Sequence, residues 1–217
     1  MRSRLKNFSN QNKIVKTHVE NNQLVANNQL VESAVKEAIK VLSSGGVILY
    51  PTDTVWGLGC DATNREAVEK IFGIKKRAES KSLIILVKDE NMLVRYVKEV
   101  PEVAFQLLEI ADTPLTIIYP GAVSLASNLV APDGSVAARI PHHPFCQRLL
   151  SGFRKPIVST SANIAGAATP SLFEEIDQNI ISAADWVAGW QLEEGSTGKP
   201  SSIIKLGLRG EVEIIRK

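Results

Sequence analysis

Hydrophobic residues recur at helical intervals in the first periodic part of the chain. From Gln29 onward, the apolar positions that share one helical face are Val31, Val35, Ala38, Ile39 and Leu42. Apolar residues spaced by three and four predict an amphipathic helix. We expect this helix to end at Gly45 and Gly46, because glycine readily adopts the left-handed conformation that follows a helix.

Short apolar runs predict strands between further helical segments. These runs are "VILYP" at 47–51, "LIILV" at 83–87, "LTIIY" at 115–119, "VAARI" at 136–140, "KPIVSTSAN" at 155–163, "PSSIIKL" at 200–206 and "EVEIIRK" at 211–217. Helical spacing predicts helices near 63–73, 101–111, 143–153 and 173–183. Strands and helices mix without strict alternation, which predicts a mixed sheet with helices packed against it.

Two of the predicted helices have clear boundary signals. Thr63, followed three residues later by Glu66, is typical of a capping box that opens a helix, and Gly73 predicts the end of the same helix. The helix near 101–111 is expected to begin with Pro101, since proline is favoured at the first helical position.

Residues 1–27 differ from the rest of the chain. They are rich in asparagine and carry only basic charges before Glu20. We interpret them as a polar and basic N-terminal tail, followed by a single domain over 28–217. A basic arm that contacts nucleic acid and a transit peptide are the alternatives for this tail.

Composition limits the classes of partner. Lys and Arg total 25 against 23 Asp and Glu, so the net charge of +2 does not indicate a dedicated nucleic-acid binder, and an aromatic content of 6% provides few side chains for base stacking. The two cysteines lack the spacing of metal ligands or of a disulfide framework. With no long apolar run and no signal peptide, we expect a cytoplasmic protein without membrane contact.

Polar side chains with a spacing of two lie beside several predicted strands. The sets are Thr52 with Thr54, Lys75 with Arg77, and Ser159 with Ser161 and Asn163; Arg139 ends a further strand. Side chains two apart on an extended chain point to the same side. Arg binds phosphate through paired hydrogen bonds and Lys acts as a point charge, so together these sets indicate an anion pocket. Each set alone also fits ordinary turn bonding or a solvated surface charge.

Histidine chemistry is not indicated. His18, His142 and His143 are the three histidines, and the pair before Pro144 is typical of a turn rather than of metal ligands. A Walker A loop and a complete dinucleotide fingerprint are also absent from the sequence.

Five segments together carry a family resemblance. "LYPTDTVWGLGCDA", "KKRAESKSL", "ARIPHHP", "VSTSANIAG" and "PSSIIKL" occur in the order found in YrdC-like proteins, the threonylcarbamoyl-adenylate synthases of transfer-RNA modification. The chain resembles this family from about Val31 to its C-terminus. The resemblance implies an α/β fold of the α+β type, with a twisted, mostly mixed sheet, flanking helices and a concave, positively charged face.

The resemblance also implies a reaction. A YrdC-like enzyme is a nucleotidyltransferase that converts L-threonine, bicarbonate and ATP into threonylcarbamoyl-AMP and pyrophosphate. Magnesium is expected as the cofactor, held mainly through the ATP phosphates rather than by protein ligands. The product passes to a tRNA threonylcarbamoyltransferase complex for the t6A37 modification of transfer RNAs that read ANN codons.

The resemblance assigns roles residue by residue. The catalytic set that engages the phosphates is Lys75, Arg77, Ser161 and Asn163. Further ATP contacts are implied at Lys81, Ser135, Thr169 and Arg216. Threonine contacts are implied at Thr54, Arg139, Ser159 and Ser201. Ala78 and Trp56 stand where relatives usually have Pro and Tyr, while the catalytic set is intact.

Two other functions remain open at this point. One is an RNA-binding YrdC-like module without turnover, in which the basic tail and the concave face make a weak tRNA or RNA contact. The other is a carbamoyl-transfer domain similar to that of hydrogenase maturation proteins. The two cysteines and the short chain argue against the second, because those proteins carry additional zinc-finger and acylphosphatase-like segments.

Overall fold

The computed structural model of the protein describes residues 27–76 and 83–217. The chain divides into two units between Ala34 and Val35. Residues 27–34 of the first unit are helical, and the second unit opens with helical residues 35–43. The domain boundary predicted between residues 27 and 28 stays a prediction.

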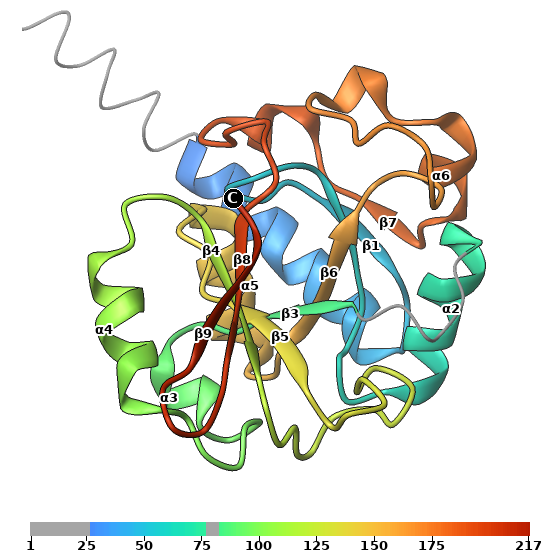
Figure 1. The fold of residues 1–217 in the computed structure, drawn as a ribbon. Helices are drawn as coiled ribbons and strands as arrows, with labels where there is room; N and C mark the ends of the chain where they lie inside the picture. Colours follow the sequence, from blue (N-terminus) through green and yellow to red (C-terminus); the bar gives the residue numbers. More distant parts are fainter. Residues whose placement is uncertain (1–26, 77–82) are drawn as a thin grey trace, which may run out of the picture. The chain divides into compact units, whose positions relative to one another are not determined.

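A mixed nine-stranded sheet organises the second unit (Figure 1). Its strands are β1 (Ile48–Tyr50), β2 (Gly57–Gly59), β3 (Ile84–Leu86), β4 (Leu115–Tyr119), β5 (Val136–Arg139), β6 (Ile157–Ser161), β7 (Trp186–Val187), β8 (Ser202–Leu206) and β9 (Val212–Arg216). Their order is β7-β1-β2-β6-β3-β5-β4-β8-β9. The pairs β1–β7, β3–β5 and β4–β8 are parallel and the others are antiparallel, so the predicted mixed sheet is confirmed.

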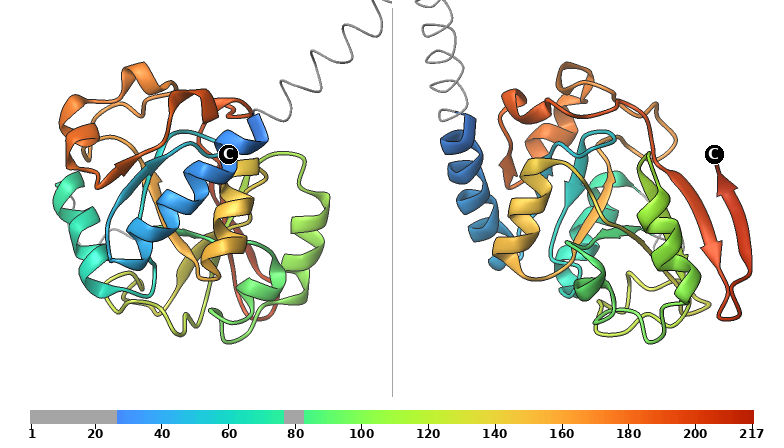
Figure 2. Two further views of the ribbon diagram at one scale, coloured as in Figure 1. Left: turned by 180° about the vertical axis from the view of Figure 1, so that it is seen from behind. Right: turned by 90° about the vertical axis from the view of Figure 1, so that its left-hand side faces the viewer.

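Helices flank this sheet, as predicted. They are α2 (Arg65–Lys75), α3 (Glu90–Leu93), α4 (Glu102–Ile110), α5 (Pro144–Phe153) and α6 (Gln178–Ala183), with 3₁₀ turns at Phe173–Glu175 and Trp190–Glu193. Helical residues 35–43 and α5 lie together over one face of the sheet (Figure 2). A methyl group on Gly152 of α5 would meet the Ile39 side chain at 2.6 Å, which shows how closely these two helices pack.

The two faces of the sheet differ in chemistry because side chains alternate along each strand. The face that packs against the helices is apolar, and its side chains Ile85, Val158, Ala138 and Ile117 are almost fully buried. On the opposite face, the strand register pairs Ser159 with Ile84 in one row. In a neighbouring row it pairs Arg139 with Thr116, and Thr116 with Ile203. Polar side chains are therefore concentrated on the face that lacks this apolar covering.

The boundaries of α2 correct two predictions. Asn64 caps the helix, accepting a hydrogen bond from the Ala67 amide at 3.1 Å, whereas the Thr63 hydroxyl donates to the Asp61 carboxylate at 2.6 Å. The capping box at Thr63 is therefore wrong by one residue. The end at Gly73 is also wrong: α2 continues to Lys75, because Lys76 itself takes the left-handed conformation (φ 47°).

Other short elements also differ from the prediction. The helix predicted over 173–183 is a 3₁₀ turn followed by α6, because the Asp177 side chain accepts from the Asn179 amide at 2.8 Å and starts a new helix. Pro101 caps α4 instead of occupying its first position. The strands β2 and β7 and the helix α3 were not predicted, since two to four residues carry too little periodicity.

Both cysteines lie inside the second unit as free thiols. Cys60 and Cys146 are buried, and burial raises the pKa of each thiol well above its usual value. The Cys146 thiol donates a hydrogen bond to the Pro51 carbonyl. In the part of the chain that the structure describes, no helix has the length and apolar character needed to cross a membrane.

Candidate active site

A cavity of about 210 Å³ opens on the polar face of the sheet. It is formed by the 52–57 loop, the ends of β3, β5 and β6, the segment before β8, and β9. Seven of the twelve predicted site residues line it: Thr54, Arg139, Ser159, Ser161, Thr169, Ser201 and Arg216. The structure therefore brings together most of the residues that the sequence singled out, although their individual roles stay predictions.

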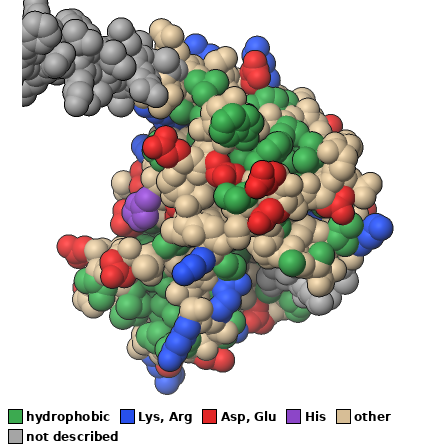
Figure 3. Space-filling model, turned by 90° about the horizontal axis from the view of Figure 1, so that it is seen from above, with side chains coloured by type: hydrophobic (Ala, Val, Ile, Leu, Met, Phe, Trp, Pro, Cys, Tyr) green, Lys and Arg blue, Asp and Glu red, His purple; other side chains and the backbone are tan. Residues whose placement is uncertain are grey.

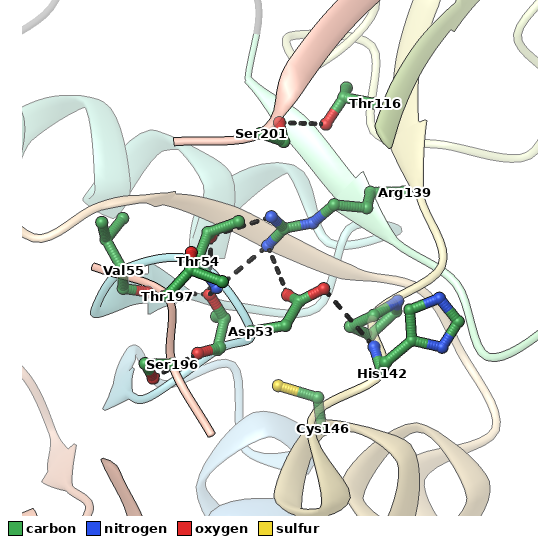
Figure 4. Close-up of polar contacts among 12 residues, drawn as sticks. Asp53, Thr54, Val55, Thr116, Arg139, His142, Cys146, Ser196, Thr197 and Ser201 are labelled. Carbon is green, nitrogen blue, oxygen red and sulfur yellow. Dashed lines mark hydrogen bonds and ion pairs between the residues drawn. The ribbon is translucent and has the colours of Figure 1, made fainter. Parts of the chain in front are cut away.

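Arg139 is the central cation of the cavity (Figure 4). Its side chain is 2% exposed and forms an ion pair with Asp53 at 3.3 Å, while Nη1 donates to the Thr54 hydroxyl at 2.8 Å. The Nε–H group is buried and has no hydrogen-bond partner among the described residues. Buried donors in proteins are normally satisfied, so this group offers a hydrogen bond to an anionic ligand.

The 52–54 loop presents two hydroxyl groups to Arg139. The Thr52 and Thr54 hydroxyls lie 2.9 Å apart because the chain bends at residues 53–55, so the extended segment expected here is a turn. Thr52 also donates to the Val55 carbonyl at 2.8 Å and accepts from the Thr54 amide at 3.1 Å, which holds the loop in one conformation. The hydroxyls are thereby fixed before any ligand arrives.

A second cation, Arg216, reaches the cavity from β9. Its Nε and Nη2 groups donate to the Ser201 carbonyl at 2.9 and 2.8 Å. The Ser201 hydroxyl pairs with Thr116 at 2.7 Å (Figure 4). Burial, and then the positive charge of Arg139, lower the pKa of Arg216. The two guanidinium groups thus form a positive region on one wall, which favours an anion.

Segment 196–198 runs beside the 52–54 loop and carries the chain toward Ser201. The amides of Thr197 and Gly198 donate to the carbonyls of Asp53 and Thr54 at 3.1 and 2.8 Å. The Ser196 hydroxyl donates to the Thr52 carbonyl. This backbone pairing positions one rim of the cavity.

The catalytic set predicted around the phosphates is described only in part. Ser161 lines the cavity, and the Lys75 ammonium donates to the carbonyls of Ser161 and Asn163 at 2.5 and 2.7 Å. The Asn163 side-chain amide donates to the Ala167 carbonyl at 2.7 Å. Arg77 and Lys81 lie outside the described residues.

Ser135 does not lie in this cavity. It lines a second hollow, of about 450 Å³, together with Asp133, Ala137 and Lys205. Ala137 and Lys205 are two residues from Arg139 and Ile203, which line the first cavity, so both hollows open on the same face of the sheet. The Ser135 hydroxyl donates to Asp133 at 2.6 Å. This hydrogen bond, followed by the one from Lys205, lowers the pKa of Asp133 to about 2.

Asp53 and Thr116 were missed as candidate site residues. An acid between two threonines in a polar loop is also the pattern of an ordinary turn, so Asp53 carried no specific signal. One clue was available: a buried arginine on a strand needs a carboxylate close by, and Asp53 lies beside the hydroxyls already chosen. Thr116 sits inside an apolar strand and gave no signal.

His143 is buried beside this site and provides a pH test. Burial lowers the pKa of His143 from its usual 6.5, more than the charge of Asp53 raises it. The unfolded chain therefore binds a proton more readily, and the stability from neutral His143 is lost as the pH falls from about 6.5 through the folded-state pKa. Between pH 7.5 and 5.5, we expect the unfolding free energy of the wild type to drop by about 1 kcal/mol more than that of His143→Phe.

Urea unfolding at the two pH values measures this difference. His142→Gln, a change at the exposed neighbour, serves as the control for loss of an imidazole from this segment. Equal pH dependence in His143→Phe and the wild type would show that His143 is not responsible.

Metal ligands do not gather in the described part of the chain. Residues 27–76 and 83–217 contain no group of three or more His, Cys, Asp or Glu side chains able to hold an ion. The Asp53 carboxylate beside the cavity is already paired with Arg139. Among the described residues, the charged and hydroxyl side chains that line the cavity are guanidinium groups and Ser or Thr hydroxyls, without a carboxylate.

Comparisons with known proteins agree on one family. The family model Sua5_yciO_yrdC, described as "Telomere recombination", matches residues 40–217. A threonylcarbamoyl-AMP synthase of Pseudoalteromonas translucida is 33% identical over 186 residues, which covers 83% of this chain and 97% of that protein.

Solved structures show the same relationship. A crystal structure of P. abyssi Sua5 complexed with L-threonine matches with a TM-score of 0.72 and 29% identity, over 79% of this chain and 50% of that one. E. coli YciO matches with a TM-score of 0.70 and 25% identity, over 84% of this chain and 88% of that one. The chain thus spans about half the length of the P. abyssi protein. The predicted α/β fold with a mixed sheet and flanking helices is confirmed, and the concave, positively charged face stays a prediction.

Proposed function

Because the chain belongs to the Sua5/YciO/YrdC family, we propose that it is a threonylcarbamoyl-AMP synthase. It would join L-threonine, bicarbonate and ATP to give threonylcarbamoyl-AMP and pyrophosphate, as a nucleotidyltransferase. The observation that carries the proposal is the Arg139 site: a buried guanidinium with an unpartnered Nε–H, next to two fixed hydroxyls, in a cavity of about 210 Å³.

This cavity suits an amino acid better than a whole nucleotide. Its volume is below the roughly 300–1,000 Å³ of pockets that enclose drug-sized ligands. We place the threonine carboxylate at Arg139, where Nε–H supplies the free donor, and the threonine side chain near Thr54 and Ser159. Ser201, which also lines the cavity, completes the predicted contacts.

ATP would extend from this cavity along the same sheet face. Ser161, Thr169 and Arg216 line the cavity, and we assign them to the phosphates together with Arg77 and Lys81. Ser135 lies in the adjoining hollow, which supports a nucleotide that spans both hollows. Its hydroxyl would have to release Asp133 to contact the nucleotide, since it donates to that carboxylate at 2.6 Å.

The reaction depends more on positioning the carbamate and ATP than on abstracting a proton. The neutral threonine amine and bicarbonate form a carbamate with loss of water, and this carbamate is already an oxyanion nucleophile that needs no activating base. The carbamate oxygen attacks the α-phosphorus of ATP, and pyrophosphate leaves with the electron pair of the broken bond. Arg139 and Arg216 would hold the anions close together and offset their repulsion. Magnesium, bound to the phosphates, would neutralise further charge.

A role in RNA modification follows from the product. We propose that threonylcarbamoyl-AMP passes to a tRNA threonylcarbamoyltransferase complex in the cytoplasm for t6A synthesis. Direct RNA binding finds less support over residues 156–198, which contain six Asp and Glu and no Lys or Arg. Figure 3, which views the molecule from above, shows acidic side chains beside hydrophobic ones on that face.

Pyrophosphate release from ATP tests the proposed function. We expect release to require threonine, bicarbonate and magnesium together, because the carbamate is the nucleophile and the metal accompanies the triphosphate. The same assay with serine measures the selectivity of the cavity. Release that is unaffected by omitting threonine would reject the assignment, and RNA binding without any release would favour the RNA-binding alternative.

A further inference from the structure

Lys75 connects the end of α2 to the turn that follows β6. Its side chain is among the most deeply buried of the described part, at 2% exposed. The ammonium group donates to the carbonyl of Ser161 at 2.5 Å and to that of Asn163 at 2.7 Å. The Lys75 carbonyl in turn accepts from the Ala165 amide at 2.9 Å. One residue thus contacts three backbone groups of the 161–165 turn.

This turn contains two residues of the predicted catalytic set. The Ser161 side chain lines the cavity, and the Asn163 amide group donates to the Ile164 and Ala167 carbonyls. Without Lys75, the carbonyls of Ser161 and Asn163 would lose a charged donor in a half-buried setting. Hydrogen bonds to charged groups are among the strongest in proteins, so their loss would let the turn change its conformation.

The position of the ammonium bears on how Lys75 contributes to turnover. Two of its three donors point to carbonyl oxygens of the protein, and the side chain is not exposed to the cavity, whose lining includes Ser161 but not Lys75. The two hydrogen bonds are also long-range, because Ser161 and Asn163 lie 86 and 88 positions from Lys75 in the sequence. A lysine that acts as a point charge on a ligand would not need this arrangement.

We propose that Lys75 is a positioning residue, which shapes the 161–165 turn so that Ser161 and Asn163 face the substrates. Its effect on turnover passes through these two residues rather than through a phosphate contact of its own. The part of the proposal that concerns ATP rests on the proposed function, whereas the effect on the turn does not.

Hydrogen exchange in the nucleotide-free protein tests the effect on the turn. Lys75→Met keeps the aliphatic stem and removes the ammonium, and we expect the amides of Asn163 and Ala165 to exchange about tenfold faster or more. Lys70→Met is the matched control, because Lys70 lies on the same helix and donates to the Gly45 carbonyl at 2.8 Å. Unchanged exchange at 163 and 165 in Lys75→Met would overturn the proposal.

Binding and turnover separate positioning from phosphate contact. In Lys75→Met we expect kcat to fall about tenfold or more, while the Kd for ATP changes less than about threefold. A rise in Kd as large as the fall in kcat would show a direct phosphate contact and overturn the proposal. A protein that does not use ATP would fail this assay and still give a decisive hydrogen-exchange result.

If Lys75→Met does not fold, NMR of the wild-type protein tests the proposal instead. In ¹⁵N NMR, we expect the Lys75 ammonium signal to be protected from exchange with water before ATP is added and to keep its position afterwards. An unprotected signal, or one that moves strongly on addition of ATP, would overturn the proposal.

Discussion

Replacement of Arg139 with methionine is expected to lower kcat/KM for threonine about a hundredfold or more, because the variant cannot donate a charge-assisted hydrogen bond to the threonine carboxylate. Arg139 supplies the free Nε–H donor of the cavity and a hydrogen bond of 2.8 Å to Thr54. Methionine retains much of the buried volume but provides no donor. Initial rates of pyrophosphate release at varied threonine concentration measure the effect.

The same substitution also destabilises the fold, which has to be separated from the loss of activity. Asp53 would remain buried without its ion-pair partner, at a cost of about 3–5 kcal/mol in the unfolding free energy. A second change, Asp53→Asn, removes this charge. We expect the double variant to recover most of the stability and none of the activity. Recovery of activity as well would show that Arg139 only balances the charge of Asp53.

Substitution of Gly59 by alanine is expected to lower the unfolding free energy by about 2 kcal/mol or more, because the added methyl group has no room. It would meet the Tyr50 ring and the Val158 carbonyl oxygen at 2.6 Å each, and Ile157 at 3.0 Å. A backbone oxygen cannot withdraw without disturbing the pairing of β2 with β6. Since Ser159 lies on β6, threonine binding should weaken too.

Gly73 offers the matched control for this experiment. It lies in α2, and a methyl group added there would meet nothing within 4 Å. Gly73→Ala should raise the unfolding free energy by about 0.5–1 kcal/mol, because alanine loses less conformational entropy in a helix. Chemical denaturation of both variants measures the contrast. Equal effects at the two positions would contradict the steric explanation for Gly59.

Sequence patterns predicted the mixed sheet and its flanking helices because most strands lie in stretches rich in apolar residues with clear ends. The pattern failed at β2, where "GLG" provides one side chain and no alternation. The reason for its glycines is tertiary: Tyr50 and Val158 approach the backbone too closely for a side chain. Such a constraint belongs to the folded state and leaves no periodic signal.

Long-range contacts also explain what was missed at the candidate site. Arg139 was identified as a strand-end cation, but its hydrogen bonds to Thr54 and Thr52 span 85 and 87 positions in the sequence. The ion pair with Asp53 is equally long-range, so it could be recognised only from the folded structure. Gly73 was taken as the end of α2 because glycine permits a helix to end. The helix instead continues to Lys75, whose ammonium donates to carbonyls at the end of β6 and in the turn that follows it.

The two buried thiols have a practical consequence for biophysical work on the protein. The thiolate is the form that attacks alkylating reagents, and burial raises the pKa of both Cys60 and Cys146, so neither native cysteine should react at neutral pH. A single cysteine introduced at an exposed position could then be labelled with a fluorophore in the otherwise wild-type chain. Spectroscopic distance measurements on this protein therefore need no cysteine-free background.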